Sequence, residues 1–280
     1  MISRVDTTAV PVAAKRTNSL VVACYRWTRM CVHVLAGVST TLFVFPLVSD
    51  VTRRSLVKRW SVRLLRILAV EIRLEGDIGV HRGNVMVVAN HISWLDIFVL
   101  NAARPVRFVA KSEIAKWPVL SQMVRGAGTL FIERERPRDI VSVNHRLAQL
   151  LAQGSVVAVF PEGTTSYGTE LLPFKGALLQ PIVEAEGHVQ PVAIRYRTPD
   201  GNLSFAPEYV GDTSFVESFW RVCGERALTV ELSARPALPA RDRHRRDVAR
   251  AAEASIRTVL AAPASAKESD TASDPEVALR

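Results

Sequence analysis

VMVVANHISWLDIF, residues 85–98, is the stretch that decides the fold. Its first five residues are apolar and mostly β-branched, which predicts a short strand buried on both faces. Ser93 is followed three residues later by Asp96 and then by apolar residues, a pattern typical of a capped helix start. His91 is therefore expected in the turn between a buried strand and a helix.

The spacing of His91 and Asp96 decides how the two side chains can meet. Residues five apart on a regular helix point about 140° away from each other, so the pair cannot share one helix face. They can meet if His91 lies just before the first turn and Asp96 lies within it. The carboxylate would then accept a hydrogen bond from one imidazole nitrogen and leave the other free as a base. The alternative is that Asp96 only caps the helix and His91 is an incidental turn residue.

The composition favours an anionic membrane partner. The chain has 280 residues, a formal net charge of +9 and 48% hydrophobic residues, which is too few for a polytopic membrane protein. Aromatic residues are sparse, and no interleaved basic–aromatic motif of the kind that stacks bases is present, so no nucleic-acid partner is expected. The cysteines have no metal-ligand spacing, which predicts no metal site and fits a reducing compartment.

The N-terminal part differs from the rest in composition. Residues 1–18 are polar and expected to be mobile, and residues 30–48 form an apolar run just short of the ~20 residues that span a bilayer. The run lies too far from the start, without a cleavage pattern, for a signal peptide. Basic residues flank both of its sides, which favours a helical hairpin in one leaflet or a tilted interfacial helix. A single short transmembrane helix is the alternative.

Residues 55–70 alternate apolar side chains, including Trp60, with basic ones. This pattern predicts an amphipathic helix suited to an anionic membrane surface. The alternative is an ordinary packed helix with a solvated basic face. Residues 19–70 are therefore expected to form a membrane-anchoring helical segment.

After residue 70 the pattern alternates between strands and helices, which predicts an α/β fold with a largely parallel sheet flanked by helices. The expected catalytic domain covers residues 71–260, and residues 261–280 are expected to be a disordered tail. The expected strands cover residues 85–89, 106–110, 129–132, 156–160, 189–194 and 227–232. The expected helices cover residues 94–101, 112–124, 138–153, 175–184, 214–224 and 241–260.

Polar or reactive residues follow each of the four middle strands. They are His91 after the first strand, Lys111 after the second, Glu133 and Arg134 after the third, and Glu162 and Gly163 after the fourth. If the strands are parallel, these residues meet at the carboxyl edge of the sheet, where open α/β sheets bind ligands. A base, a pair of cations and a glycine-bearing loop predict a site for an anionic substrate.

Four motifs resemble those of the glycerolipid acyltransferases, the 1-acylglycerol-3-phosphate acyltransferase family. They are NHISWLD (90–96), GTLFIER (128–134), FPEGT (160–164) and VQPVAI (189–194), and they occur in the family's order. The resemblance implies acyl transfer with His91 as the general base and Asp96 as its partner. It implies an acceptor head group held by Lys111, Arg134 and the loop residues Glu162, Gly163 and Thr164. It also implies acyl-CoA or acyl-carrier protein as the donor, with no metal and no cofactor.

Two departures from the family's pattern leave the acceptor open. Thr165 stands where the third motif commonly has arginine, and the segment at 173–177, which is similar to the family's Pro-Phe-Lys element, is one residue shorter. The expected acceptor is lysophosphatidic acid, acylated at its sn-2 hydroxyl to phosphatidic acid in phospholipid synthesis. Another lysolipid such as lyso-ornithine lipid, or a non-catalytic role in binding anionic membranes, is the alternative. The expected location is the inner membrane, with the catalytic domain facing the cytoplasm.

Overall fold

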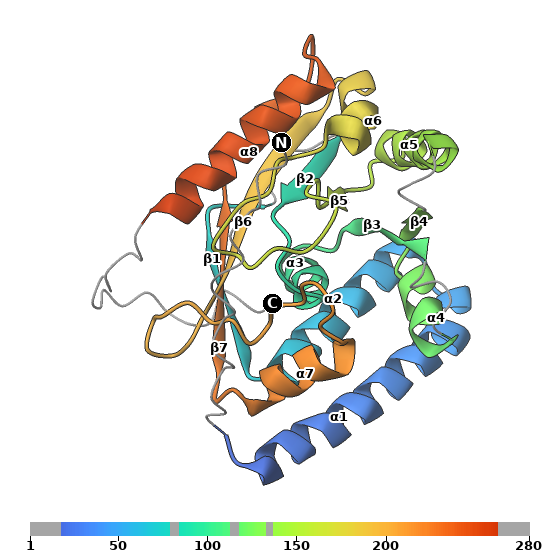
Figure 1. Ribbon diagram of the computed structural model, residues 1–280. Helices are drawn as coiled ribbons and strands as arrows, with labels where there is room; N and C mark the ends of the chain where they lie inside the picture. The colour runs from blue at the N-terminus through green and yellow to red at the C-terminus, as the bar shows by residue number, and fades with distance from the viewer. Residues whose placement is uncertain (1–17, 79–83, 113–117, 133–136, 263–280) are drawn as a thin grey trace, which may run out of the picture.

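One mixed sheet with helices on both faces forms the centre of the molecule (Figure 1). The computed structural model describes residues 18–78, 84–112, 118–132 and 137–262. Within these residues the strand order is β1-β7-β6-β2-β5-β3-β4, with β8 pairing β6. The strands are β1 (Val70–Glu75), β2 (Val85–Ala89), β3 (Arg107–Lys111), β4 (Leu130–Ile132), β5 (Val157–Val159), β6 (His188–Arg197), β7 (Leu228–Ala234) and β8 (Leu238–Pro239).

The middle of the sheet is parallel, as predicted. β2 pairs in parallel with both β5 and β6, β3 pairs in parallel with β5 and β4, and only the pairs that β6 makes with β7 and β8 are antiparallel among the described strands. All five residues of β2 are buried, as the apolar run predicted. The carboxyl ends of β2, β3, β4 and β5 therefore face one edge of the sheet.

Helices cover the two faces of the sheet, and each face has a large hydrophobic core of its own. They are α1 (Leu20–Ser39), α2 (Asp50–Ile67), α3 (Leu95–Ala103), α4 (Pro118–Gly126), α5 (Pro137–Ala152), α6 (Gln180–Glu184), α7 (Phe215–Gly224) and α8 (Arg245–Ala261). Val87 and Ala89 of β2 join the core formed with α2, α3 and α7, whereas Met86 and Val88 join the core formed with α5 and α8. This alternation follows from the two-residue period of a strand, in which successive side chains point to opposite faces of the sheet.

The apolar N-terminal segment forms a helical hairpin. α1 continues through a π-helical turn, η1 (Thr40–Val44), and a 3-10 turn, η2 (Phe45–Leu47), before α2 returns. His33 of α1 stacks on Trp60 of α2 with ring centroids 4.5 Å apart, and each ring hydrogen-bonds the other residue's carbonyl. By length and composition, Leu20–Leu47 is a helix apolar enough to cross a membrane, with a mean hydropathy of 1.8.

Several element boundaries differ from the sequence prediction. α2 begins at Asp50 rather than at 55, because the Ser49 hydroxyl caps it by accepting from the Thr52 amide. The helix expected at 112–124 is found as α4 from Pro118, and residues 113–117 lie outside the described part. The helix expected at 175–184 is a 3-10 turn, η4 (Gly176–Leu179), followed by the short α6. β1 and β8 were not predicted. Both termini, 1–17 and 263–280, lie outside the described residues.

Candidate active site

Asn90 locks the end of β2 onto β6. Its side-chain amide donates to the Ile194 carbonyl at 3.0 Å, and its side-chain oxygen accepts from the Ile194 amide at 2.7 Å. The buried side chain thus imitates a strand's backbone and extends the pairing by one residue. The following residue, His91, leaves the sheet from a fixed point.

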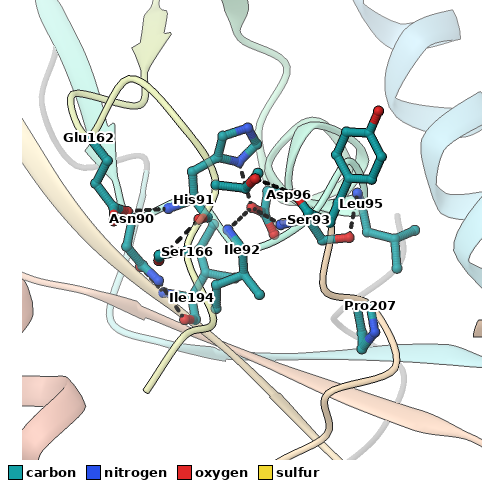
Figure 2. A network of polar contacts seen from close by, with 12 residues as sticks. Asn90, His91, Ile92, Ser93, Leu95, Asp96, Glu162, Ser166, Ile194 and Pro207 are labelled. Carbon is teal, nitrogen blue, oxygen red and sulfur yellow. Dashed lines mark hydrogen bonds and ion pairs between the residues drawn. The ribbon is translucent and has the colours of Figure 1, made fainter. Parts of the chain in front are cut away.

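His91 and Asp96 meet as the spacing predicted (Figure 2). The His91 Nδ1 atom lies 2.8 Å from Asp96 Oδ2, and Asp96 is fully buried in the first turn of α3. A neutral imidazole that donates from Nδ1 has its lone pair on Nε2. The His91 side chain is 16% exposed, and Nε2 has no hydrogen-bond partner within the described ranges. That nitrogen is therefore available as a base.

Asp96 is held by more donors than His91 alone. Its Oδ2 atom also accepts from the backbone amides of Ile92 at 2.7 Å and Ser93 at 2.9 Å, and the Ser93 hydroxyl in turn accepts from the Leu95 amide at 3.2 Å. Only half of the expected capping pair forms, because the Ser93 hydroxyl bonds the Leu95 amide rather than that of Asp96. α3 begins at Leu95, and its N-cap residue, Trp94, has no side-chain cap bond. The other carboxylate oxygen of Asp96, Oδ1, accepts from the Tyr196 hydroxyl at 2.7 Å. Cap amides and a phenol stabilise the anion that faces the imidazole.

The loop after β5 holds the backbone of His91 on both sides. Glu162 Oε1 accepts from the His91 amide at 2.7 Å, and the Ser166 amide donates to the His91 carbonyl at 2.8 Å. Glu162 Oε2 accepts from the Leu172 amide at 3.1 Å. Burial raises the pKa of Glu162, and the two amide bonds oppose that rise. Both carboxylate oxygens are thus engaged by protein donors.

Phe160 fixes the plane of the His91 ring. Its ring stacks on the His91 imidazole with centroids 4.0 Å apart and planes 8° apart, and Phe108 stacks behind it at 5.8 Å. The ring contact and the Asp96 bond together leave the imidazole one orientation, which points Nε2 away from the carboxylate (Figure 2).

Gly163 lets the loop pass close to a cation. It has a φ of +77°, and a Cβ placed there would stand 3.2 Å from the Lys175 ammonium. The Lys175 amide donates to the Pro161 carbonyl at 2.9 Å, which fastens the Pro-Phe-Lys element beside the loop. Thr164 is exposed, and Thr165 donates its hydroxyl to the Tyr209 carbonyl. Sequence reasoning noted Lys175 but gave it no role.

The remaining sequence-predicted residues are placed only in part. Lys111 ends β3, and its backbone pairs with Ile132 at the end of β4, on the sheet edge where β2 leads to His91. Glu133 and Arg134 lie outside the described residues. Among the residues that are described, no group of three or more His, Cys, Asp or Glu side chains could hold a metal ion.

Comparison with known proteins identifies the family. Residues 71–195 match the family model described as Acyltransferase. A lyso-ornithine lipid O-acyltransferase of Pseudomonas aeruginosa is 37% identical over 215 residues, which cover 76% of this chain and 81% of that protein. The chain belongs to the acyltransferase family. All four motifs lie within the matched residues 71–195.

Other relatives carry a different acceptor in their names. The 1-acyl-sn-glycerol-3-phosphate acyltransferase of Neisseria gonorrhoeae is 43% identical over 152 residues, covering 54% of this chain. The chain spans 59% of the length of that relative. The crystal structure of the 1-acyl-sn-glycerophosphate (LPA) acyltransferase, PlsC, from Thermotoga maritima shares the fold, with a TM-score of 0.64 at 21% identity. That match covers 87% of this chain and 96% of the other.

Proposed function

We propose that the protein is an O-acyltransferase that moves a fatty acyl group from an acyl thioester to a hydroxyl of a lysolipid. The observation that carries the proposal is the His91–Asp96 pair, in which Nδ1 is bound at 2.8 Å and Nε2 is left open. A lysolipid hydroxyl is a poor nucleophile until a base removes its proton, and such a pair supplies that base.

The reaction needs one proton transfer in each direction. The acceptor oxygen attacks the thioester carbonyl while His91 Nε2 takes the hydroxyl proton, so that an ester C–O bond forms. The C–S bond then breaks, and the imidazolium returns its proton to the departing thiolate. Asp96 stabilises the imidazolium between the two steps. The thioester already carries an activated acyl group, so no covalent acyl-enzyme is required.

The residues around the pair divide into holding and positioning roles. Lys111, Arg134, Gly163 and Thr164 are proposed to hold the acceptor head group, and Lys175 adds a cation beside Gly163. Glu162 is proposed to act differently from the sequence expectation. Its carboxylate accepts from two backbone amides, which supports a positioning role behind His91 rather than a contact with substrate.

Lysophosphatidic acid is the proposed acceptor, with the sn-2 hydroxyl as the reacting group and acyl-CoA or acyl-carrier protein as the donor. The support is the 43% identity to a relative named for that reaction and the arginine of the second motif. A phosphate monoester carries nearly two negative charges, which cationic side chains match.

Lyso-ornithine lipid is a second candidate acceptor, and one observation favours it. Thr165 replaces the arginine common in the third motif, and its hydroxyl is occupied by the Tyr209 carbonyl. The site thereby has one phosphate partner fewer. The relatives named for this acceptor also match over more of the chain, 76% against 54%.

We also propose that residues 19–70 anchor the protein on the cytoplasmic face of the inner membrane and that residues 71–260 form the catalytic domain. The support is the apolar hairpin, whose turn exposes 72% of Phe43 and 84% of Leu47. Labelling of introduced cysteines from outside intact cells should miss both termini. Labelling of the N-terminus alone would replace the hairpin with a span.

The test of the proposed reaction is an acyl-transfer assay of the full-length protein with a panel of lysolipids and both thioester donors. We expect ester formation that depends on His91 with at least one lysolipid. No transfer to any member of the panel by folded protein would contradict the proposal.

A further inference from the structure

A cleft lined by arginines opens at the amino ends of β3 and β4. It has a volume of about 550 Å³. Arg107 comes from the start of β3, Arg125 from the end of α4 and Arg146 from α5, and none of the described residues that line the cleft is acidic. Three guanidinium groups from three elements thus converge on one hollow.

A smaller hollow of about 190 Å³ adjoins the cleft and adds more positive charge. It shares Arg107 and Arg125 and adds Arg53 and Arg54 from the first turns of α2. Among the described residues that line either hollow, Asp50 is the one acidic residue; it pairs with Arg107 at 2.9 Å and with Arg54 at 3.4 Å. One carboxylate among five arginines leaves a strong positive excess.

Arg107 has donor capacity that the described residues do not use. Its Nη2 atom binds Asp50, but its Nε atom is buried without a hydrogen-bond partner within the ranges described. Gly128, with a φ of +77°, approaches so closely that any side chain there would collide with the Arg107 guanidinium. The Arg107 side chain is 23% exposed, and a partly desolvated guanidinium of this kind favours an oxyanion that can accept two bonds at once.

The cleft is separate from the proposed catalytic site. In the sheet register, Arg107 pairs with Val157 of β5, and Val157 pairs with Met86 of β2. His91 follows Met86 by five residues, which corresponds to about 16 Å along a strand. A head group in the cleft would therefore sit at the opposite end of the strands from the base.

α4, which contributes Arg125 to both hollows, lies beside the turn of the N-terminal hairpin (Figure 1). Gly126, which lines the smaller hollow, packs against Thr41 and Phe45 of that turn. The turn exposes Phe43 and Leu47. With these side chains in the acyl region of a bilayer, the arginines would lie at the depth of the head groups.

We propose that this cleft binds the phosphate of an anionic phospholipid of the bilayer, a lipid that is not the reacting acceptor. The inference rests on the proposed membrane association of the hairpin and not on the proposed acyl transfer. The bound lipid would fix how the protein sits on the membrane, with the hairpin turn and the cleft as two points of contact.

The test is binding of full-length protein to phosphatidylcholine vesicles with and without phosphatidylglycerol. Each arginine near an anionic surface contributes about 5-fold, so Arg125→Gln/Arg146→Gln should weaken binding to the anionic vesicles by about 25-fold. The matched control is Arg243→Gln/Arg246→Gln, which removes the same charge from exposed positions at the start of α8. We expect it to lose less than about 2-fold. Equal losses in the two double variants would overturn the inference.

Two further measurements separate a head-group site from general attraction. Arg125→Lys/Arg146→Lys keeps the charge but loses the planar fork, so it should recover only part of the binding; full recovery would overturn the inference. Inorganic phosphate should not displace the protein from vesicles at the ionic strength of a matched chloride control. Displacement by phosphate alone would assign the cleft to free phosphate instead. A wild-type protein that binds neither kind of vesicle would remove the anchoring proposal and the inference together.

Discussion

The Tyr196 hydroxyl donates to Asp96 Oδ1 at 2.7 Å, across 100 residues of sequence. Burial raises the pKa of Tyr196 well above its usual value, and the negative charge of Asp96 raises it further, so the phenol remains a donor throughout the working range. With Oδ2 bound to His91 and to two amides, the carboxylate cannot turn away from the imidazole.

Tyr196→Phe tests whether this bond positions the catalytic pair. The change leaves one oxygen of a buried carboxylate short of a donor, so we expect kcat to fall about tenfold and stability to fall by about 1–3 kcal/mol. A loss of stability with an unchanged kcat would mean that Tyr196 is only a packing residue.

His91→Ala should remove the base and lower kcat by about 10²–10⁴-fold. Folding should be nearly unaffected, because the side chain is partly exposed and Asp96 retains three other donors. His145→Ala, at an exposed position on α5, is the matched control. Near-normal activity of purified, folded His91→Ala would contradict the mechanism. Asp96→Asn should also lose most activity, but with lower stability, since its amide would face backbone donors.

Glu162→Gln tests the proposed positioning role. A glutamine has one acceptor oxygen for the two amides of His91 and Leu172, so one buried N–H would face the new NH₂ group. We expect kcat to fall about tenfold, stability to fall by about 1–3 kcal/mol and the KM for the acceptor to change little. Glu170→Gln, exposed on the same loop, should change neither quantity. A rise in KM at constant kcat would restore a role in binding the head group.

Local signals were enough to predict the strand, the turn and the histidine–aspartate contact. The five apolar residues of β2 and the cap around Ser93 and Asp96 lie within twelve residues, so their pattern and spacing decide the geometry. The parallel sheet followed from the alternation of apolar runs and helical segments. β1 was missed although Val70, Ile72 and Leu74 alternate with charged residues, because the helix expected before it was extended through residue 70 and only continuous apolar runs were assigned to strands.

The partners of the catalytic pair could not be predicted in the same way. Tyr196, Glu162 and Asn90 make their contacts across 100, 71 and 104 residues of sequence, respectively, and only the packing of β2 between β5 and β6 brings them together. A buried tyrosine in a strand and a glutamate in a loop have no local pattern that names a partner. The arginine cleft likewise draws on α2, β3, α4 and α5.

Glu208 should make stability depend on pH. Burial raises its pKa to about 7 from 4.5, and the nearby Arg221 opposes that rise. The folded state thus binds more protons than the unfolded state between these values, so stability should fall as pH rises from about 4.5 to 7 and then level off. Glu208→Gln should remove this fall. We expect a Tm about 2–4 °C above wild type at pH 8 and little difference at pH 5.

The control for this prediction is Glu217→Gln, which removes a carboxylate from an exposed position on α7. Its Tm should follow the wild-type pH dependence. Parallel curves for wild type and Glu208→Gln would show that the carboxyl ionises alike in the folded and unfolded states.

Thr165→Arg tests what decides the acceptor. The change restores the arginine common in the third motif, and a planar guanidinium can bind two oxygens of a phosphate monoester. We expect the ratio of kcat/KM for lysophosphatidic acid to that for lyso-ornithine lipid to rise about tenfold, the gain of one charge-assisted contact. Thr165→Val, which removes the hydroxyl bond to Tyr209 without adding charge, should leave the ratio unchanged.

Substitution of Arg134 removes a cation instead of adding one, and it is tested with the same kcat/KM ratio. Arg134→Ala should weaken use of lysophosphatidic acid far more than use of the thioester donor, and Arg134→Lys should recover only part, because an ammonium lacks the fork. The wild-type ratio decides between the two acceptors. A clear preference for lyso-ornithine lipid would replace lysophosphatidic acid as the proposed substrate, while the fold and the reaction at His91 would stand, since neither depends on the charge of the head group.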